Sequence, residues 1–309
     1  MYEDYFYGHA RICIAFFVLL NQSSHKVVAV VTQPDRPAGR GKSLTPPPVK
    51  TLALELGLPV IQPLDLKSPS FESTLLEYQA DIFVVVAFSI LPKKILGASR
   101  YGALNIHGSL LPAYRGAAPV QWAIANGEPK TGVTIFLLDE KMDHGPILEQ
   151  REVAIDMEDT AQTLLDKMVL PACDGLEQAL IKVETNISSV IMQDHNQATG
   201  APKLKKEDGL LDFQKSALEL HNRIRGFSPW PGGYSNLQGK KIYLRKTRVF
   251  EDSIKLNPGH LLIEKNHLLV GTGSGVLEIL EIQAEGKKSM PASDYIKGLH
   301  QREGLLFCS

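Results

Sequence analysis

Apolar residues recur at different spacings in the front and back parts of the chain, and the point where the spacing changes divides the chain in two. In residues 27–138, short apolar runs typical of buried strands alternate with segments whose apolar residues recur at helical spacing. The expected strands are residues 27–31, 81–87, 103–107 and 132–138, and residues 59–63 are expected to form a short extended segment. The expected helices are residues 49–56, 71–78, 92–96, 119–126 and 160–180. Strands that alternate with helices predict a parallel α/β sheet.

The pattern of apolar and polar residues changes near residue 186. Residues 193–206 are polar and contain glycine, proline and three lysines, which predicts a linker. Beyond it the apolar residues recur with a period of two, and the expected strands are residues 241–245, 260–263, 267–270 and 276–280. The glycine-rich residues 271–275 separate two apolar runs, which is typical of a hairpin turn. Short strands with glycine-rich turns predict a small closed β-barrel.

Residues 12–20 form one apolar run near the start of the chain. The run is too short to span a bilayer. Glu3 and Asp4 precede it and no small-residue cleavage site follows, so it does not fit a secretory signal. We therefore expect a buried strand or helix here and no membrane segment.

Composition adds a charge asymmetry to this picture. The chain has 309 residues, enough for about two domains, and a net charge of −1. Residues 201–309 nevertheless carry 17 Lys+Arg against 12 Asp+Glu, which favours a polyanionic partner for the back half, although such a balance is also common in ordinary domains. Three scattered cysteines and no histidine pair at metal spacing predict a reduced protein of the cytoplasm without a metal.

The candidate chemistry lies at the end of the third expected strand. Asn105 and His107 are two residues apart, so they share one face of the strand. One offers an amide donor, and the other changes charge near neutral pH. They could be satisfied core polar groups, but a polar turn follows at residues 109–112, where α/β sheets bind ligands. With Asp143 from a later loop they suit acyl transfer to an amine, although Asp143 alone could be a turn former.

Two basic regions stand apart from this site. Residues 34–48 form a cationic Pro/Gly-rich stretch, long for a loop of a compact domain, and such loops tend to be functional or disordered. Gly41 and Lys42 do not end a phosphate-binding loop there, because Arg36 occupies the position of its first glycine. The basic residues of the back half could form one patch or a merely solvated surface, and they are Lys203, Lys205, Lys206, Arg223, Arg225, Lys240, Lys241, Arg245, Lys246 and Arg248.

Together these segments resemble the methionyl-tRNA formyltransferase family. The matching segments are residues 32–41, 105–112, 115–119, 132–134, 142–145, 201–208, 222–226 and 229–234. The resemblance implies an α/β fold with a Rossmann-like parallel-sheet catalytic domain at 1–188, a linker at 189–206 and an OB-like barrel at 207–309. It implies formyl transfer from 10-formyltetrahydrofolate to the amino group of methionine on initiator tRNA.

The resemblance also implies roles for single residues. Asn105, His107 and Asp143 would be catalytic. The folate contacts would be Phe88, Ile90, Ser109, Leu110, Leu111 and Pro112. The tRNA contacts would be Arg36, Arg40, Lys42, Lys203, Lys205, Lys206, Arg223 and Arg225. We expect a cytoplasmic monomer whose partners are initiator tRNA and folate, with no metal and no membrane.

Two segments depart from the family pattern. Residues 1–18 lack its first strand and glycine-threonine-proline turn, and residues 86–92 are one residue shorter than the pocket-lining segment. A missing first strand would leave a central strand of the sheet without a neighbour. The rival enzymes are sugar-nucleotide formyltransferases, glycinamide ribonucleotide formyltransferases and formyltetrahydrofolate hydrolases, and the rival of another class is an inactive RNA-binding remnant. The basic loop and the basic back half argue against the two small-substrate enzymes.

Overall fold

The computed structural model describes residues 14–38, 43–86, 91–185, 190–250, 254–299 and 303–308. The chain divides into two compact units, each interrupted in sequence. Unit 1 draws its described residues from Met1–Pro119, Thr131–Ala154 and Leu165–Ala201. Unit 2 draws them from Val120–Lys130, Ile155–Leu164 and Pro202–Ser309, so two short pieces of the front half fold with the back half.

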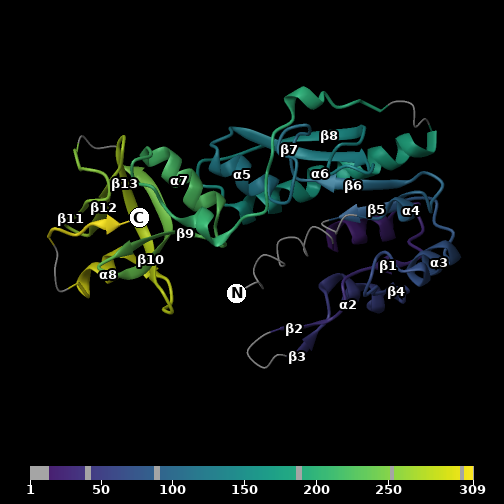
Figure 1. Ribbon diagram of the computed structural model, residues 1–309, viewed down its shortest axis with the longest axis horizontal. Coiled ribbons are helices and arrows are strands. Elements are labelled where there is room, and N and C mark those ends of the chain that lie inside the picture. The colour runs from purple at the N-terminus through teal and green to yellow at the C-terminus, as the bar shows by residue number, and fades with distance from the viewer. Residues whose placement is uncertain are drawn as a thin grey trace. The chain divides into compact units, whose positions relative to one another are not determined.

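The strands of unit 1 are β1 (Val30–Val31), β2 (Arg36–Ala38), β3 (Ser43–Thr45), β4 (Val60–Ile61), β5 (Phe83–Val86), β6 (Ala103–His107), β7 (Lys130–Leu137) and β8 (Ile147–Ala154). β1 pairs with β4 and β5 with β6, and both pairs are parallel. β7 runs antiparallel to β6, and β8 completes this sheet beside β7 (Figure 1). In the described part of the chain no strand joins β1 to β5, so the parallel strands form two sheets.

Helices accompany these strands. They are a helix at residues 14–22, α2 (Pro48–Glu55), α3 (Pro69–Glu77), α4 (Lys93–Leu96) and α6 (Ala161–Thr185). α3 starts where the Ser68 hydroxyl accepts a hydrogen bond from the backbone of Phe71, as an N-cap should. α6 approaches β7 closely, because a Cβ on Gly175 would lie 2.7 Å from the Ile135 side chain. The glycine therefore sets the distance between this helix and the sheet.

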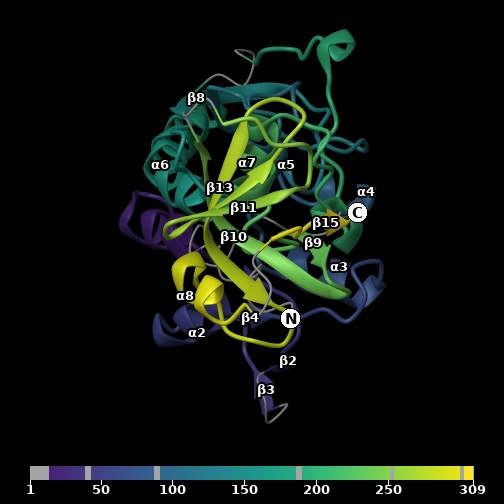
Figure 2. The same cartoon turned by 90° about the vertical axis from the view of Figure 1, so that its left-hand side faces the viewer.

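Unit 2 is built on one antiparallel sheet. Its strands are β9 (Gly233–Leu237), β10 (Lys240–Phe250), β11 (Leu261–Glu264), β12 (His267–Gly271), β13 (Val276–Ala284), β14 (Met290–Pro291) and β15 (Phe307–Cys308). The order is β11-β12-β13-β10-β9-β15, with β14 on β13. Figure 2 labels β11, β13, β10, β9 and β15 of this sheet. The sheet curls into a half-barrel, and backbone hydrogen bonds from Leu261 to Leu305 and from Phe307 to Gly259, each 2.9 Å, join its two ends.

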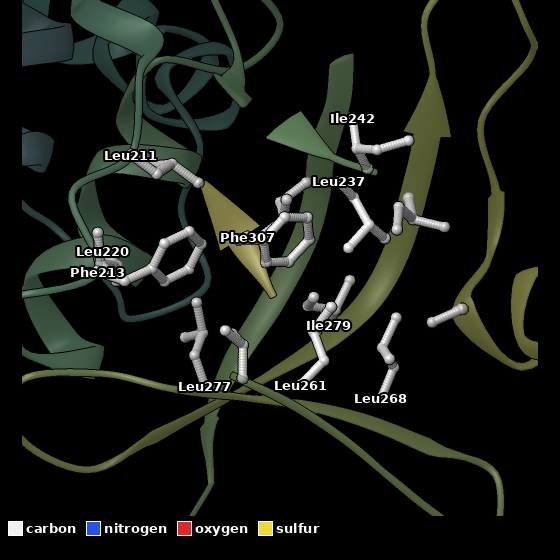
Figure 3. Close-up of a cluster of buried hydrophobic side chains, with 14 of the residues drawn as sticks. Leu211, Phe213, Leu220, Leu237, Ile242, Leu261, Leu268, Leu277, Ile279 and Phe307 are labelled. Atoms are coloured by element: carbon white, nitrogen blue, oxygen red, sulfur yellow. The ribbon is translucent and has the colours of Figure 1, made fainter. Parts of the chain in front are cut away.

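The core of unit 2 fills the inside of this curl (Figure 3). Ile242 and Leu244 on β10 are buried between partly exposed Tyr243 and Arg245, as the period of two requires. The rings of Phe213 and Phe307 stack with centroids 5.3 Å apart. Three helices belong to this part of the chain, and they are α5 (Pro119–Ala125, from its second residue), α7 (Ala217–Gly226) and α8 (Ala292–Lys297).

α7 begins at a reciprocal cap. The hydroxyl of Ser216 accepts from the backbone of Glu219, and the carboxylate of Glu219 accepts from the backbone of Ser216. This capping box satisfies two backbone donors that the first turn of a helix leaves without partners. The helix then presents Leu220 and Ile224 to the core of unit 2.

The fold-class prediction is confirmed: Rossmann-like parallel strands are followed by a small OB-like sheet. β6 has the predicted bounds, α2 and α3 lie within about two residues of theirs, and residues 271–275 are the predicted hairpin turn between β12 and β13. The apolar run at 12–20 is helical over its described residues.

Three expectations need correction. The sheet is not wholly parallel, because β7 returns antiparallel along β6. The basic residues 34–48 are not an unstructured loop, because β2 and β3 pair within them. The predicted closed barrel is a half-barrel sheet whose two ends meet, in the part of the chain that the structure describes, at the isolated bridge between His260 and Leu306 and not along paired strands. Of the two departures, at residues 1–18 and 86–92, residues 1–13 and 87–90 lie outside the described residues, and residues 14–18 are helical.

Candidate active site

β6 carries the first two candidate residues to the end of its sheet. Asn105 lies opposite Val85 on one neighbouring strand and opposite Phe136 on the other, and His107 lies opposite Thr134. Strands on both sides therefore fix the backbone of Asn105, and β7 fixes that of His107. The Asn105 side chain is half-buried and makes no hydrogen bond to any residue that the structure describes. Its amide group is available to a ligand.

The turn after β6 is fixed by one buried threonine. The hydroxyl of Thr134 donates to the carbonyl of Ser109 at 2.6 Å and accepts from the backbone of Leu111 at 3.0 Å. The hydroxyl of Ser109 in turn donates to the carbonyl of Ala113 at 2.6 Å. Ser109 and Leu111 are buried, whereas Leu110 and Pro112 are half-buried. The first pair shapes the turn, and the second pair is accessible.

His107 is held by its ring nitrogen Nε2, which lies 2.9 Å from the carbonyl of Tyr114. Because a carbonyl only accepts, Nε2 carries the hydrogen, and Nδ1 is the nitrogen that can gain or lose a proton. Nδ1 lies 3.7 Å from Oδ2 of Asp143, and both side chains are largely buried. The structure thus brings together two residues that are far apart in sequence, at a distance slightly longer than a hydrogen bond.

The Asp143 loop has tight backbone geometry. Asp143 has φ 51, in the left-handed region, and its Oδ2 accepts a 2.8 Å hydrogen bond from the backbone of Gly116. A Cβ on Gly145 would lie 1.8 Å from the carbonyl oxygen of Leu137, so only glycine fits there. One carboxylate oxygen of Asp143 is therefore fixed from a turn that lies 27 residues earlier.

The basic residues proposed for tRNA differ in their surroundings. Arg36 on β2 is exposed, as are Lys203, Lys205 and Lys206 in unit 2. Arg40, Lys42, Phe88 and Ile90 lie outside the described residues. Arg223 is half-buried, donates to the carbonyl of Asp208 at 3.0 Å and lies over the ring of Phe227.

Arg225 does not fit a role in tRNA contact. Its side chain is only 7% exposed. Nε and Nη2 donate to the amide oxygen of Asn222, and Nη1 donates to the carbonyls of Asp156 and Asp159, with distances of 2.8–2.9 Å. Burial lowers the pKa of this guanidinium, and the nearby carboxylates of Asp159 and Glu158 oppose that effect. Arg225 therefore bonds to other residues of unit 2 and does not offer its charge at the surface.

Sequence reasoning missed several residues around the candidate site. Gln193 is buried, and its side-chain amide donates to the carbonyls of Asp143 and Gly145. It lies in the stretch predicted as a linker, and no local pattern marks it. The threonine beneath the turn, Thr134, was placed only in a strand. Gly116 had one usable signal, because it lies in a segment that carries the family resemblance.

Three further observations concern a metal site, a membrane segment and a reactive thiol. No group of three or more His, Cys, Asp or Glu side chains suited to a metal ion occurs among the described residues. No helix in that part of the chain is both long and apolar enough to cross a membrane. Burial raises the pKa of the Cys173 thiol, which makes it a weak nucleophile.

Comparison with known families defines the class. The formyl transferase family model matches residues 9–180, and the model of the formyl transferase C-terminal domain matches residues 203–300. The solved N-formyltransferase from Helicobacter canadensis, in complex with folinic acid and dTDP-3-aminofucose, shares this fold. It superposes with a TM-score of 0.67 over 88% of this chain and 96% of that chain, at 17% sequence identity. The fold and the two family matches are those of a formyl transferase.

The curated relatives identify the family within this class. A methionyl-tRNA formyltransferase of Geobacter metallireducens is 42% identical over 93% of this chain and 92% of its own length. One of Thermodesulfovibrio yellowstonii is 42% identical over 97% of both chains. The chain belongs to the methionyl-tRNA formyltransferase family.

Proposed function

We propose that the chain transfers the formyl group of 10-formyltetrahydrofolate to the amino group of methionine on initiator tRNA. The observation that carries this proposal is the end-to-end similarity to enzymes of that name, which covers both units. A sugar N-formyltransferase shares the fold at 17% identity, which is too low to carry its substrate across. An inactive remnant is not favoured, because Asn105 and His107 share β6 and Asp143 lies 3.7 Å from His107, which supports a working site.

Asn105 and His107 are proposed to stabilise the oxygen of the formyl group. When the amine attacks the formyl carbon, that oxygen becomes an oxyanion and needs hydrogen-bond donors. The side-chain amide of Asn105 is one donor. Nδ1 of His107 is the other once it carries a proton, because Nε2 is already engaged by the carbonyl of Tyr114. One such donor is worth about 10²–10³ in rate.

Asp143 is proposed to move a proton. The amine forms a bond to the formyl carbon and becomes acidic, and the Asp143 carboxylate takes its extra proton. The bond from the formyl carbon to the donor nitrogen then breaks, and His107 supplies a proton to that departing nitrogen. The products are a formamide and the deformylated folate, and one proton then passes from Asp143 back to Nδ1 of His107. No covalent intermediate with the enzyme is required, since both substrates are held together.

The folate contacts divide into two groups. Leu110 and Pro112 are half-buried and are proposed to touch the donor directly. Ser109 and Leu111 are proposed to act by shaping the turn, because their side chains face inward. Phe88 and Ile90 remain proposed contacts on the family resemblance alone.

The tRNA is proposed to meet exposed cations on both units. Arg36, Lys203, Lys205 and Lys206 have exposed side chains, which suits contacts to phosphate. Arg223 is a proposed contact through the nitrogens left over from its bond to Asp208. Arg40 and Lys42 are proposed contacts on sequence alone. Arg225 is removed from this group because it is buried.

The wider organisation is also a proposal. We propose a catalytic domain at 1–188, a linker at 189–206 and a tRNA-binding domain at 207–309, which the family matches at 9–180 and 203–300 support. We further propose that the chain acts as a monomer in the cytoplasm, where charged tRNA is found. Sedimentation equilibrium at working concentration tests the monomer, and a dimer mass would contradict it.

The test of the function is a formylation assay with three acceptors. Purified protein is incubated with 10-formyltetrahydrofolate and charged initiator tRNA, the same tRNA without methionine, or a dTDP-linked amino sugar. We expect a formylated product from the charged tRNA alone. Product from the amino sugar but not from the tRNA would support the rival enzyme, and binding of tRNA without product would support the remnant.

A further inference from the structure

Residues 190–201, called the strap from here on, cross both turns that surround Asp143. Ile191 and Ile147 exchange two backbone hydrogen bonds of 2.8 Å. At the other end, the backbone of Arg115 donates to Thr199 at 2.8 Å, and the backbone of Ala201 donates to Arg115 at 2.6 Å. The strap is therefore attached to the start of β8, just after the loop that carries Asp143, and to the turn whose Gly116 binds the carboxylate.

Gln193 lies at the middle of this arrangement and is 6% exposed. Its Nε2 lies 3.1 Å from the carbonyl oxygen of Asp143 and 2.7 Å from that of Gly145. Both hydrogens of the amide are thus used on the two carbonyls that flank His144. Asp143 has φ 51, in the left-handed region that is uncommon for residues other than glycine, although aspartate enters it more readily than most. The bonds from Gln193 help to hold the loop in this conformation.

Arg115 determines which way the amide of Gln193 points. Its Nη2 donates to Oε1 of Gln193 at 2.5 Å. A guanidinium only donates, so the oxygen of the amide must face Arg115 and the NH₂ group must face the loop. The same Nη2 lies 2.9 Å from Nδ1 of His195, which therefore acts as an acceptor. The donating nitrogens of Arg115 therefore fix the orientation of the Gln193 amide.

The strap also covers the loop through a ring contact. The rings of His195 and His144 stack with centroids 3.8 Å apart and planes 12° from parallel. His144 is held in turn by Asp139, whose carboxylate lies 2.7 Å from Nδ1. Burial and the nearby His144, Arg115 and Lys141, against a smaller opposing effect of Asp139, lower the pKa of His195. A neutral His195 suits both its stacking and its bond to Arg115.

We infer that Gln193 is a positioning residue: it holds the peptide on which Asp143 stands, so that the carboxylate stays between the backbone of Gly116 and the ring of His107. This inference rests on the proposed function, because it assigns Asp143 the transfer of a proton. Gln193 touches neither substrate in this account. It acts through Asp143, so its loss lowers the rate of chemistry and leaves substrate binding in place.

The decisive variant is Gln193→Glu. It keeps the shape of the side chain and its acceptor for Arg115, but it replaces the donating NH₂ with an oxygen that repels the two loop carbonyls. We expect kcat to fall about 10–10²-fold, the cost of a small misplacement of a catalytic group, while KM for folate and for tRNA changes by less than about threefold. Gln197→Glu is the matched control, because this glutamine of the same strap is exposed and its side-chain amide donates to Asp194, the partner it has among the described residues.

A double-mutant cycle separates positioning from general damage. If Gln193 acts through Asp143, then Gln193→Glu should cost little further activity once Asp143→Asn is present. Full additivity of the two losses would overturn the inference. A rise in KM with unchanged kcat, or a kcat equal to that of the control, would also overturn it.

Hydrogen exchange gives a readout that does not depend on activity. The peptide that spans residues 139–147 should exchange faster in Gln193→Glu than in the wild-type chain and in the control. If the wild-type chain makes no product but this exchange still rises, the proposed function fails and the anchoring of the loop stands. If the wild-type chain is active and neither kcat nor exchange changes, the inference alone fails.

Discussion

Two buried polar clusters, one in each unit, are built from similar groups but differ in how completely those groups are bonded. The Arg225 cluster in unit 2 directs the arginine donors at three acceptors, the side chain of Asn222 and the carbonyls of Asp156 and Asp159. The Asp143 cluster in unit 1 also holds its backbone firmly. Its two ionisable side chains, however, face each other across 3.7 Å without a hydrogen bond.

The difference separates a structural network from a candidate site. A buried polar network stabilises a fold only when its members are satisfied, since a lone buried donor or acceptor is costly. A site for proton transfer needs groups whose bonds are completed only when substrate arrives. The half-bonded pair at the end of β6 and the arginine of unit 2, which donates from all three of its nitrogens, follow these two rules.

Replacing Asp143 should produce the largest effect. Asp143→Asn keeps an oxygen that can accept from Gly116 but removes the negative charge that takes the proton. We expect kcat for formylation of charged initiator tRNA to fall about 10²–10⁴-fold, with little change in thermal stability. Asp294→Asn, on the surface of α8, is the control. A loss in tRNA affinity equal to the loss in kcat would contradict the role.

Removing the arginine of the other cluster should affect stability instead. Arg225→Met leaves the amide oxygen of Asn222 and two carbonyls without their donor. We expect the free energy of unfolding to fall by about 1–3 kcal/mol or more, while the salt dependence of tRNA binding stays unchanged. Urea denaturation followed by tryptophan fluorescence measures the first quantity, with the exposed Lys297→Met as control. Unchanged stability with a weaker salt dependence would return Arg225 to the tRNA surface.

Lowering the pH should also destabilise the chain through His221, which belongs to the Arg225 cluster. His221 is buried beside Arg225, and burial lowers its pKa in the folded state below 6.5, although its bond to the carbonyl of Met157 opposes this. The unfolded chain then binds more protons just below pH 6.5, so stability should fall as the pH drops through that value and stay flat above it. His221→Phe should flatten this fall in denaturation curves taken between pH 7 and 5. If the stability of His221→Phe fell with pH as steeply as that of the wild-type chain, His221 would not be the cause of the fall.

Single surface lysines should give the smallest effect. Lys205→Ala removes one exposed cation of unit 2. If the lysine touches phosphate, tRNA affinity should weaken modestly, and the slope of log affinity against log salt should drop by about one unit. Filter binding across a salt series measures the slope, and Lys67→Ala, an exposed lysine of unit 1, serves as a comparison. An identical slope would remove Lys205 from the interface.

Local pattern was sufficient for many of the elements. β6 was predicted at its observed bounds, and α2 and α3 were predicted to within a turn, because apolar spacing and prolines near the first turn are local signals. β8 was missed, since Glu149, Gln150 and Arg151 hide its alternation. α7 was also missed, even though Ser216 and Glu219 form a recognisable cap.

The amino-acid sequence by itself determined where β6 runs, which residues stand at its end, and which family the motifs resemble, because each of these depends on neighbours within a few positions. Only the tertiary structure decided that Gln193, in an apparent linker, holds the carbonyl of a residue 50 positions away. It also decided that Arg225 is enclosed and not on the surface. Hydrogen bonds and burial depend on which distant segments come together in the folded chain. The charge and spacing of residues along the chain do not show which segments those are.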